Sequence, residues 1–91
     1  MEIPVELKRK YLERRVQDIQ HLISSLDQND FAPAAKLGHQ VKGNAVTFDF
    51  PQMAPIGIEI EQAAKTRNKE ELILLVQRMN TEIQLARLSF H

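Results

Sequence analysis

The sequence predicts an all-α protein, an antiparallel up-down four-helix bundle. Three observations favour this fold class. Apolar residues recur at steps of three and four in four separate stretches, which is the spacing of a buried helical face. Short polar or proline-containing segments separate these stretches. Aromatic residues are only 5% of the chain, whereas Leu, Ile, Glu, Gln, Lys and Arg are frequent. Helices with one apolar stripe each and short connections pack as an antiparallel bundle.

The first helix is expected over roughly residues 4 to 28. Pro4 suits its first turn, where the missing N–H of proline costs nothing. Leu7 and Tyr11 are expected to extend its buried face. A short polar break follows at residues 27–30, and Asp30 is expected to cap the next helix. The predicted inner face of the first helix consists of Leu12, Val16, Ile19, Ile23 and Leu26.

The second helix is expected to run to about Phe48 and to present His39 to solvent. At about 100° per residue, the centre of its apolar stripe lies roughly 150° away from His39. The imidazole therefore points outward while its neighbours point into the bundle. The stripe consists of Ala34, Gly38, Val41, Ala45 and Phe48.

Small and apolar residues surround His39 on the same helical face. Ala35 and Gly43 lie one turn to either side, Val46 follows at i+7, and Lys42 lies at i+3, within reach of a group attached to the imidazole. A glycine inside a helix costs about 1 kcal/mol relative to alanine, and such a residue usually has a packing or functional reason. We expect the reason here to be close approach by another molecule.

The third and fourth helices have recognisable starting signals. Asp49 is expected to cap the third helix, with Pro51 in its first turn and Gln52 as a capping-box partner. Asn68 and Glu71 form a second capping-box pattern at the start of the fourth helix. The expected inner faces contain Met53, Ile56, Ile60, Ala63 and Ala64 in the third helix, and Leu72, Leu75, Val76, Met79, Ile83 and Ala86 in the fourth.

Composition limits the classes of function. Residues 1–91 are expected to form a single domain, and its start at Met1 and end at His91 fit a free-standing protein. Lys and Arg number 12, as do Asp and Glu, so no basic field favours nucleic acid or a membrane surface. No apolar run is long enough for a membrane span or a signal peptide. Cysteine is absent, which excludes disulfides and thiolate sites, and a cytoplasmic location is expected.

The remaining chemistry centres on His39. A metal site is not expected, because His21 lies on another helix and His91 is the last residue; both are expected to be inert. No serine or cysteine nucleophile motif and no glycine-rich phosphate loop occurs, so an enzyme with its own nucleotide site is not expected. An exposed imidazole can instead accept a phosphoryl group and yield it to another acceptor.

The residues around His39 resemble a known signature. His39-Gln40-Val41-Lys42-Gly43-Asn44-Ala45 is similar to the His-x-Leu-Lys-Gly-Ser-Ala motif of histidine-containing phosphotransfer (HPt) domains, the four-helix modules of bacterial two-component phosphorelays. By architecture the resemblance covers essentially the whole chain. By motif it covers the middle third, extending through Thr47, Phe48, Phe50 and Pro51 to Ile60-Glu61.

This resemblance implies a role for each matching residue. It implies that His39 is phosphorylated, that Lys42 stabilises the phosphoryl charge, and that Gly43 leaves room for the partner. Glu61 falls where family members carry a Glu or Gln that hydrogen-bonds the other ring nitrogen of the histidine. Asp49 replaces a glycine that the family often has, and aspartate tolerates a left-handed conformation better than most residues.

The resemblance also implies a function and its partners. The domain would accept a phosphoryl group from a histidine kinase or a receiver-domain aspartate and pass it to the aspartate of a response-regulator receiver. It would need no cofactor, since Mg²⁺ is expected in the receiver. Ala35, Gln40 and Val46 are expected to contact the partner, and a monomer is expected. The alternative is an adaptor module that binds signalling partners without being phosphorylated.

Overall fold

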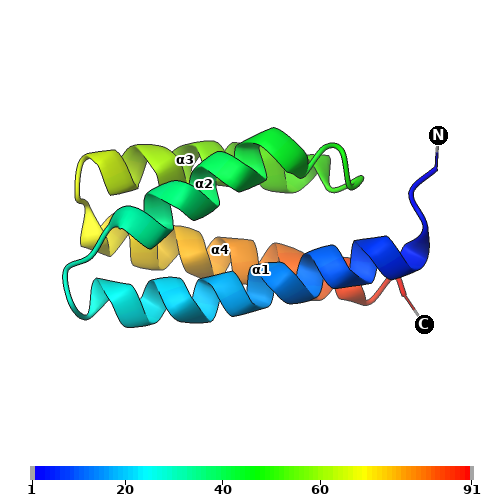
Figure 1. Cartoon of the computed structure of the whole chain (residues 1–91), viewed down its shortest axis with the longest axis horizontal. Helices are drawn as coiled ribbons and strands as arrows, with labels where there is room; N and C mark the ends of the chain where they lie inside the picture. Colours follow the sequence, from blue (N-terminus) through cyan, green and yellow to red (C-terminus); the bar gives the residue numbers. More distant parts are fainter. Residues whose placement is uncertain (1, 91) are drawn as a thin grey trace.

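The computed structural model describes residues 2–90 and consists of helices joined by short connections (Figure 1). Consecutive helices run in opposite directions, and residues 2–90 contain no strand. The predicted all-α, antiparallel four-helix bundle is therefore confirmed. Its helices are α1 (Val5–Leu26), α2 (Ala32–Asn44), α3 (Ala54–Lys65) and α4 (Lys69–Arg87), with a short 3₁₀ turn, η1 (Pro51–Met53), before α3.

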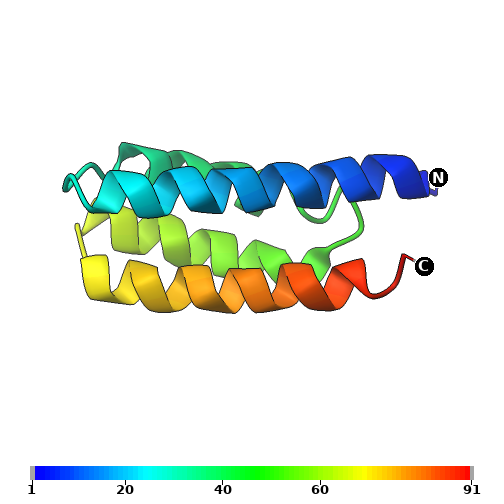
Figure 2. The same ribbon diagram turned by 90° about the horizontal axis from the view of Figure 1, so that it is seen from below.

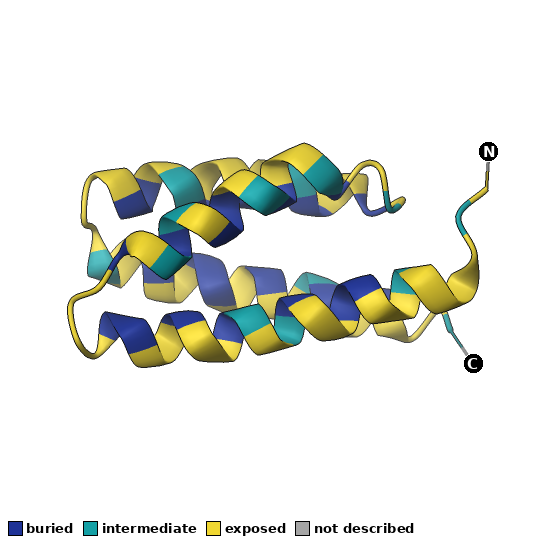
Figure 3. Ribbon diagram, in the orientation of Figure 1, coloured by how far each residue is buried: buried dark blue, intermediate teal, exposed yellow. Residues whose placement is uncertain are grey.

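The helices form two pairs that enclose one core. Helices α2 and α3 lie side by side over α1 and α4 (Figures 1 and 2). Buried residues lie on the inward faces of all four helices, and exposed residues cover the outside (Figure 3). The largest side chains that are completely enclosed are Leu12, Leu22, Val41, Met53, Ile56, Ile60, Leu72, Met79 and Ile83.

The inner face of α1 differs from the prediction at two positions. Ile23 is 50% exposed, and Leu22 is completely buried in its place. Both residues are separated from Ile19 and Leu26 by steps of three and four, so spacing alone does not distinguish them. Leu7 is also exposed, because it lies on the first turns of α1, where the other helices cover less of it.

An aromatic cluster fixes the segment after α2. Helix α2 ends at Asn44 rather than near Phe48, and residues 45–49 form turns. The ring of Tyr11 stacks on that of Phe48 with centroids 4.5 Å apart. The Tyr11 hydroxyl donates a hydrogen bond to Oδ1 of Asn44 at 2.6 Å, and burial raises the pKa of this hydroxyl. Helix α1 thus holds the end of the helix that carries His39.

The turn between α2 and α3 has a left-handed residue. Asp49 has a φ of 70°, a conformation that glycine adopts most easily and aspartate tolerates. Its carboxylate accepts a hydrogen bond from Nζ of Lys8 at 3.0 Å. The predicted cap by Asp49 and Gln52 is wrong, because the chain enters η1 at Pro51 with no side-chain cap.

Two other predicted caps have partners at helix starts. Oδ1 of Asp30 accepts a hydrogen bond from the backbone N–H of Ala32 at 3.1 Å, although Phe31 occupies the residue before α2. Oδ1 of Asn68 accepts one from the backbone N–H of Glu71 at 3.1 Å, which confirms Asn68 as the cap of α4. The other half of the predicted capping box does not form, because the backbone N–H of Asn68 donates to the carbonyl oxygen of Ala63 at 2.9 Å.

Glycines allow the backbones of α2 and α3 to touch. A Cβ atom on Gly38 would lie 2.5 Å from the backbone nitrogen of Glu61 and 2.7 Å from the carbonyl oxygen of Gly57. A Cβ atom on Gly57 would lie 2.8 Å from the backbone nitrogen of Lys42. Side chains on these two helices therefore meet across a very short distance.

Gly38→Ala is expected to lower the free energy of unfolding by about 1–3 kcal/mol, because the added methyl group overpacks the contact between α2 and α3. Gly43→Ala is the matched control. Apart from its chain neighbours and the backbone of α2, a Cβ atom there would meet nothing of residues 2–90 within 4 Å, and alanine raises helix stability by up to about 1 kcal/mol. Urea unfolding followed by circular dichroism measures both. Stabilisation by both substitutions would contradict the backbone contact.

Candidate functional site

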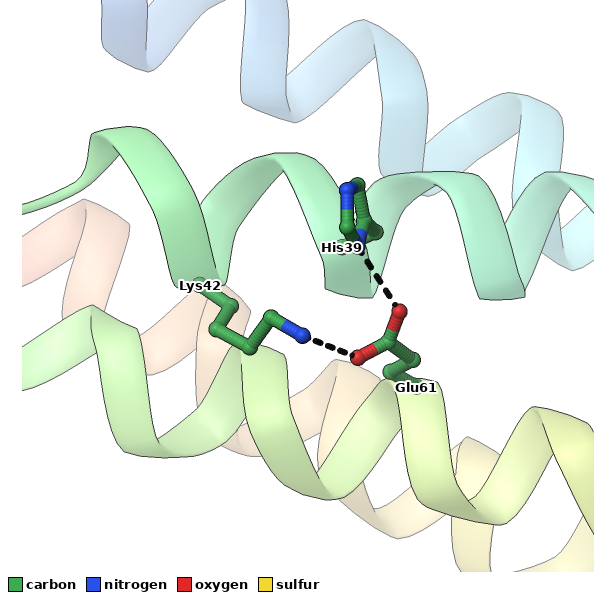
Figure 4. A network of polar contacts seen from close by, with 3 residues as sticks. All are labelled: His39, Lys42 and Glu61. Atoms are coloured by element: carbon green, nitrogen blue, oxygen red, sulfur yellow. Dashed lines mark hydrogen bonds and ion pairs between the residues drawn. The ribbon is translucent and has the colours of Figure 1, made fainter.

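His39 projects from α2 into solvent, and Glu61 reaches it from α3 (Figure 4). The histidine side chain is 69% exposed, and its Nδ1 atom lies 3.0 Å from Oε2 of Glu61. An ionised carboxylate can only accept hydrogen bonds, so Nδ1 carries the proton in this contact. In the neutral imidazole, Nε2 then keeps its lone pair and faces outward.

Glu61 uses its second oxygen for Lys42. The Nζ atom of Lys42 donates a hydrogen bond to Oε1 of Glu61 at 2.7 Å (Figure 4). This hydrogen bond is the main reason that the pKa of Glu61 lies below its usual range. Desolvation raises the pKa and opposes the shift, whereas the His39 hydrogen bond and the charges of Lys42 and Lys65 lower it further. Glu61 is therefore an anion at neutral pH, with one oxygen on each partner.

The surface around His39 matches the predicted arrangement of small and apolar residues in part. Gly43 is exposed, and apart from its chain neighbours and the backbone of its own helix, no atom of residues 2–90 lies within 4 Å of the position its Cβ would occupy. Packing among these residues therefore does not require this glycine. Val46 is 61% exposed in the turn after α2. Ala35 and Gln40 are half-buried, and Ala35 packs against the core.

Two residues on α3 that lie near Glu61 were not identified from the sequence. Ile58 lies three residues before Glu61 and is about half exposed. Lys65 lies four residues after Glu61 and is exposed. Their spacing from Glu61 places all three on one face of α3. This spacing was visible in the sequence, but it pointed to the site only once Glu61 was known to face His39.

His21 lies away from this arrangement. His21 lines a cavity of about 450 Å³ between α1 and α2, together with Arg14, Asp18 and Lys36. His91 lies outside the described residues. Within residues 2–90, no group of three or more His, Asp or Glu side chains could hold a metal ion. None of the helices described is both long and apolar enough to cross a membrane.

Comparison with protein families identifies the chain. The model of the Hpt domain matches residues 6–88 of the 91 residues. The chain belongs to the Hpt domain family. Comparison with curated proteins and with solved structures gave no significant match. The resemblance noted in the sequence is thus confirmed over nearly the whole chain.

Membership of the family establishes the general function. An Hpt domain carries out histidine phosphotransfer in a two-component phosphorelay and is an intermediate rather than a kinase. Hpt domains relay phosphoryl groups with kinases and receiver domains.

The pKa of Glu61, followed by ¹³C NMR of its carboxyl carbon, is expected to lie below the usual range for glutamate. Lys42→Gln is expected to raise it more than Lys65→Gln, because the Lys42 hydrogen bond is the largest cause of the shift. Since the pKa is lower in the folded state, the carboxylate stabilises the fold at neutral pH, and this contribution is lost as the pH falls through the lowered pKa. An unchanged pKa in Lys42→Gln would contradict the ion pair.

Proposed function

We propose that His39 of this Hpt domain is the residue that carries the phosphoryl group, bound to Nε2. The observation that supports this most is the hydrogen bond between Nδ1 and Glu61, at 3.0 Å, which leaves Nε2 as the nucleophilic nitrogen on the exposed side of the ring. The adaptor alternative does not account for an exposed histidine held in one tautomer by a carboxylate that a lysine also contacts.

The transfer step requires little from this chain beyond orientation. The Nε2 lone pair attacks the phosphorus of a receiver's aspartyl phosphate, and the N–P bond forms as the bond from phosphorus to the carboxylate oxygen breaks. The receiver leaves with a free aspartate, and the proton on Nδ1 stays in place. The positive charge that develops on the ring is balanced by Glu61 across the Nδ1–H bond. Reversal of these steps passes the group to another receiver.

We assign the supporting roles to neighbouring residues. Lys42 stabilises the charge of the phosphoryl oxygens, since it lies one helical turn from His39 and its side chain is 40% exposed. Gly43 leaves room for the receiver's active site, and Ala35, Gln40 and Val46 contact the receiver. The Mg²⁺ ion that assists transfer is supplied by the receiver's acidic pocket.

The partners follow from the same proposal. A histidine kinase or a receiver domain supplies the phosphoryl group, and a response-regulator receiver accepts it. The receiver docks over α2 through a modest, transient interface. We propose that the domain works as a monomer in the cytoplasm, a location that the absence of cysteine favours.

His39→Gln is expected to abolish labelling when the protein is mixed with a receiver phosphorylated with ³²P. The label on the natural chain should be stable in base and labile in acid, as expected for a phosphoramidate. His21→Gln is the matched control and should be labelled normally. Label that persists in His39→Gln would assign the phosphoryl group to another residue, and no label on the natural chain from any receiver or kinase would favour the adaptor.

Gly43→Ala is expected to slow transfer from the receiver by tenfold or more, because a methyl group beside His39 displaces the incoming active site and small misplacements are costly for transfer. The same variant should fold at least as stably as the natural chain. Single-turnover transfer rates measure the effect. A normal rate in a stably folded Gly43→Ala protein would rule out the proposed role of this glycine.

A further inference from the structure

Two anions compete for one lysine in the proposed mechanism. The Nζ atom of Lys42 donates to Oε1 of Glu61 at 2.7 Å, and the proposed function also assigns Lys42 to the phosphoryl oxygens on His39. If Lys42 turns toward the phosphoryl group, Oε1 of Glu61 loses its donor. The Glu61 side chain is 12% exposed while Lys42 covers it, so the departure of Lys42 leaves this oxygen to water unless another cation approaches. Glu61 keeps its hydrogen bond from Nδ1 of His39, but a carboxylate that loses one of its two donors is less stable.

Lys65 is placed to replace that donor. It lies four residues after Glu61 at the C-terminal end of α3, and a glutamate followed by a lysine at i+4 is the favourable order for a helical ion pair. Lys65 is exposed, and its ammonium forms no ion pair or hydrogen bond with any of residues 2–90. Its positive charge already lowers the pKa of Glu61, so the electrostatic influence of Lys65 reaches the carboxylate.

We propose that Lys65 replaces Lys42 as the ion-pair partner of Glu61 when His39 is phosphorylated, which frees Lys42 for the phosphoryl oxygens. This inference rests on the proposed function of His39. Lys65 is then a positioning residue that acts through Glu61 and touches neither the phosphoryl group nor the receiver. It keeps Glu61 ionised and hydrogen-bonded to Nδ1 while Lys42 stabilises the charge of the phosphoryl oxygens.

If this exchange occurs, Lys65 stabilises the phosphorylated protein more than the unphosphorylated one. Its loss should therefore shift the equilibrium of phosphotransfer away from phosphohistidine. An exposed i,i+4 ion pair is weak, so we expect Lys65→Gln to lower the equilibrium constant for formation of phosphohistidine by about twofold to threefold. This constant does not depend on how tightly the receiver docks, provided that little complex is present.

The experiment mixes each variant with a phosphorylated receiver and measures the distribution of label at equilibrium. Lys65→Arg should restore the natural constant, because it keeps the charge. Lys10→Gln is the matched control: it removes a charge from an exposed lysine on α1 and should leave the constant unchanged. In a Glu61→Gln background, the further change Lys65→Gln should have no effect, because the amide no longer needs a cation.

Direct observation of the lysines keeps the test independent of the Glu61 variant. In ¹⁵N-lysine NMR spectra recorded in weak base, where phosphohistidine is stable, phosphorylation should slow hydrogen exchange of the Lys65 ammonium with water. The Lys10 ammonium should not change. The Lys65→Arg spectrum, from which the Lys65 signal is missing, assigns that signal.

Two results would overturn the exchange. A constant for Lys65→Gln equal to that of Lys10→Gln, with no change of the Lys65 ammonium on phosphorylation, would show that Lys65 has no part in it. An effect of Lys65→Gln that persists in the Glu61→Gln background would place Lys65 on the phosphoryl group or the receiver instead. Failure of the proposed function looks different, because the natural chain would then take no label on His39.

Discussion

Direct contact between the backbones of α2 and α3 is the constraint on which the site depends. Gly38 and Gly57 have no Cβ atoms, and any Cβ at these positions would lie closer than packing allows to backbone atoms of the facing helix. The contact brings Glu61 within hydrogen-bond distance of two side chains on α2. A helix pair separated by larger side chains would leave this carboxylate too far away to orient the imidazole.

The three glycines of the chain lie in two different environments. Gly38 and Gly57 allow the helices to approach each other, whereas Gly43 faces open space. The left-handed position after α2 is filled by Asp49 instead, and Lys8 pairs with its carboxylate. Glycine thus occurs where the space between α2 and α3 is scarce, and an aspartate fills the turn after α2, where only the backbone angle is demanding.

The sequence predicted the fold class and the placement of His39 from periodicity, because one face of each helix must be buried. It did not distinguish Ile23 from Leu22, since both fit the same spacing and only the packing of the other helices decides which one is buried. It predicted a cap at Asp49 from residue type, but that carboxylate pairs with Lys8, 41 residues away in sequence. Contacts between distant residues of this kind leave no local pattern.

In the candidate site too, features within one helix could be predicted from the sequence, whereas contacts between helices could not. Lys42 and Gly43 could be placed beside His39 by counting along one helix. The contact with Glu61 could not be derived in this way, and it was expected only from the resemblance to HPt domains. Ile58 and Lys65 were missed for the same reason, because their relevance depends on how α3 is rotated against α2. Packing of the two helices, not helix formation, sets this rotation.

The most direct test of the account identifies the nitrogen that carries the phosphoryl group. Protein labelled with ¹⁵N in its histidines would be phosphorylated by a receiver and examined by NMR in weak base for coupling between ³¹P and the ring nitrogens. The account predicts coupling to Nε2 of His39, with Nδ1 still protonated and hydrogen-bonded to Glu61. Coupling to Nδ1 would contradict it, because that nitrogen faces the carboxylate and would have to break the contact that orients the ring.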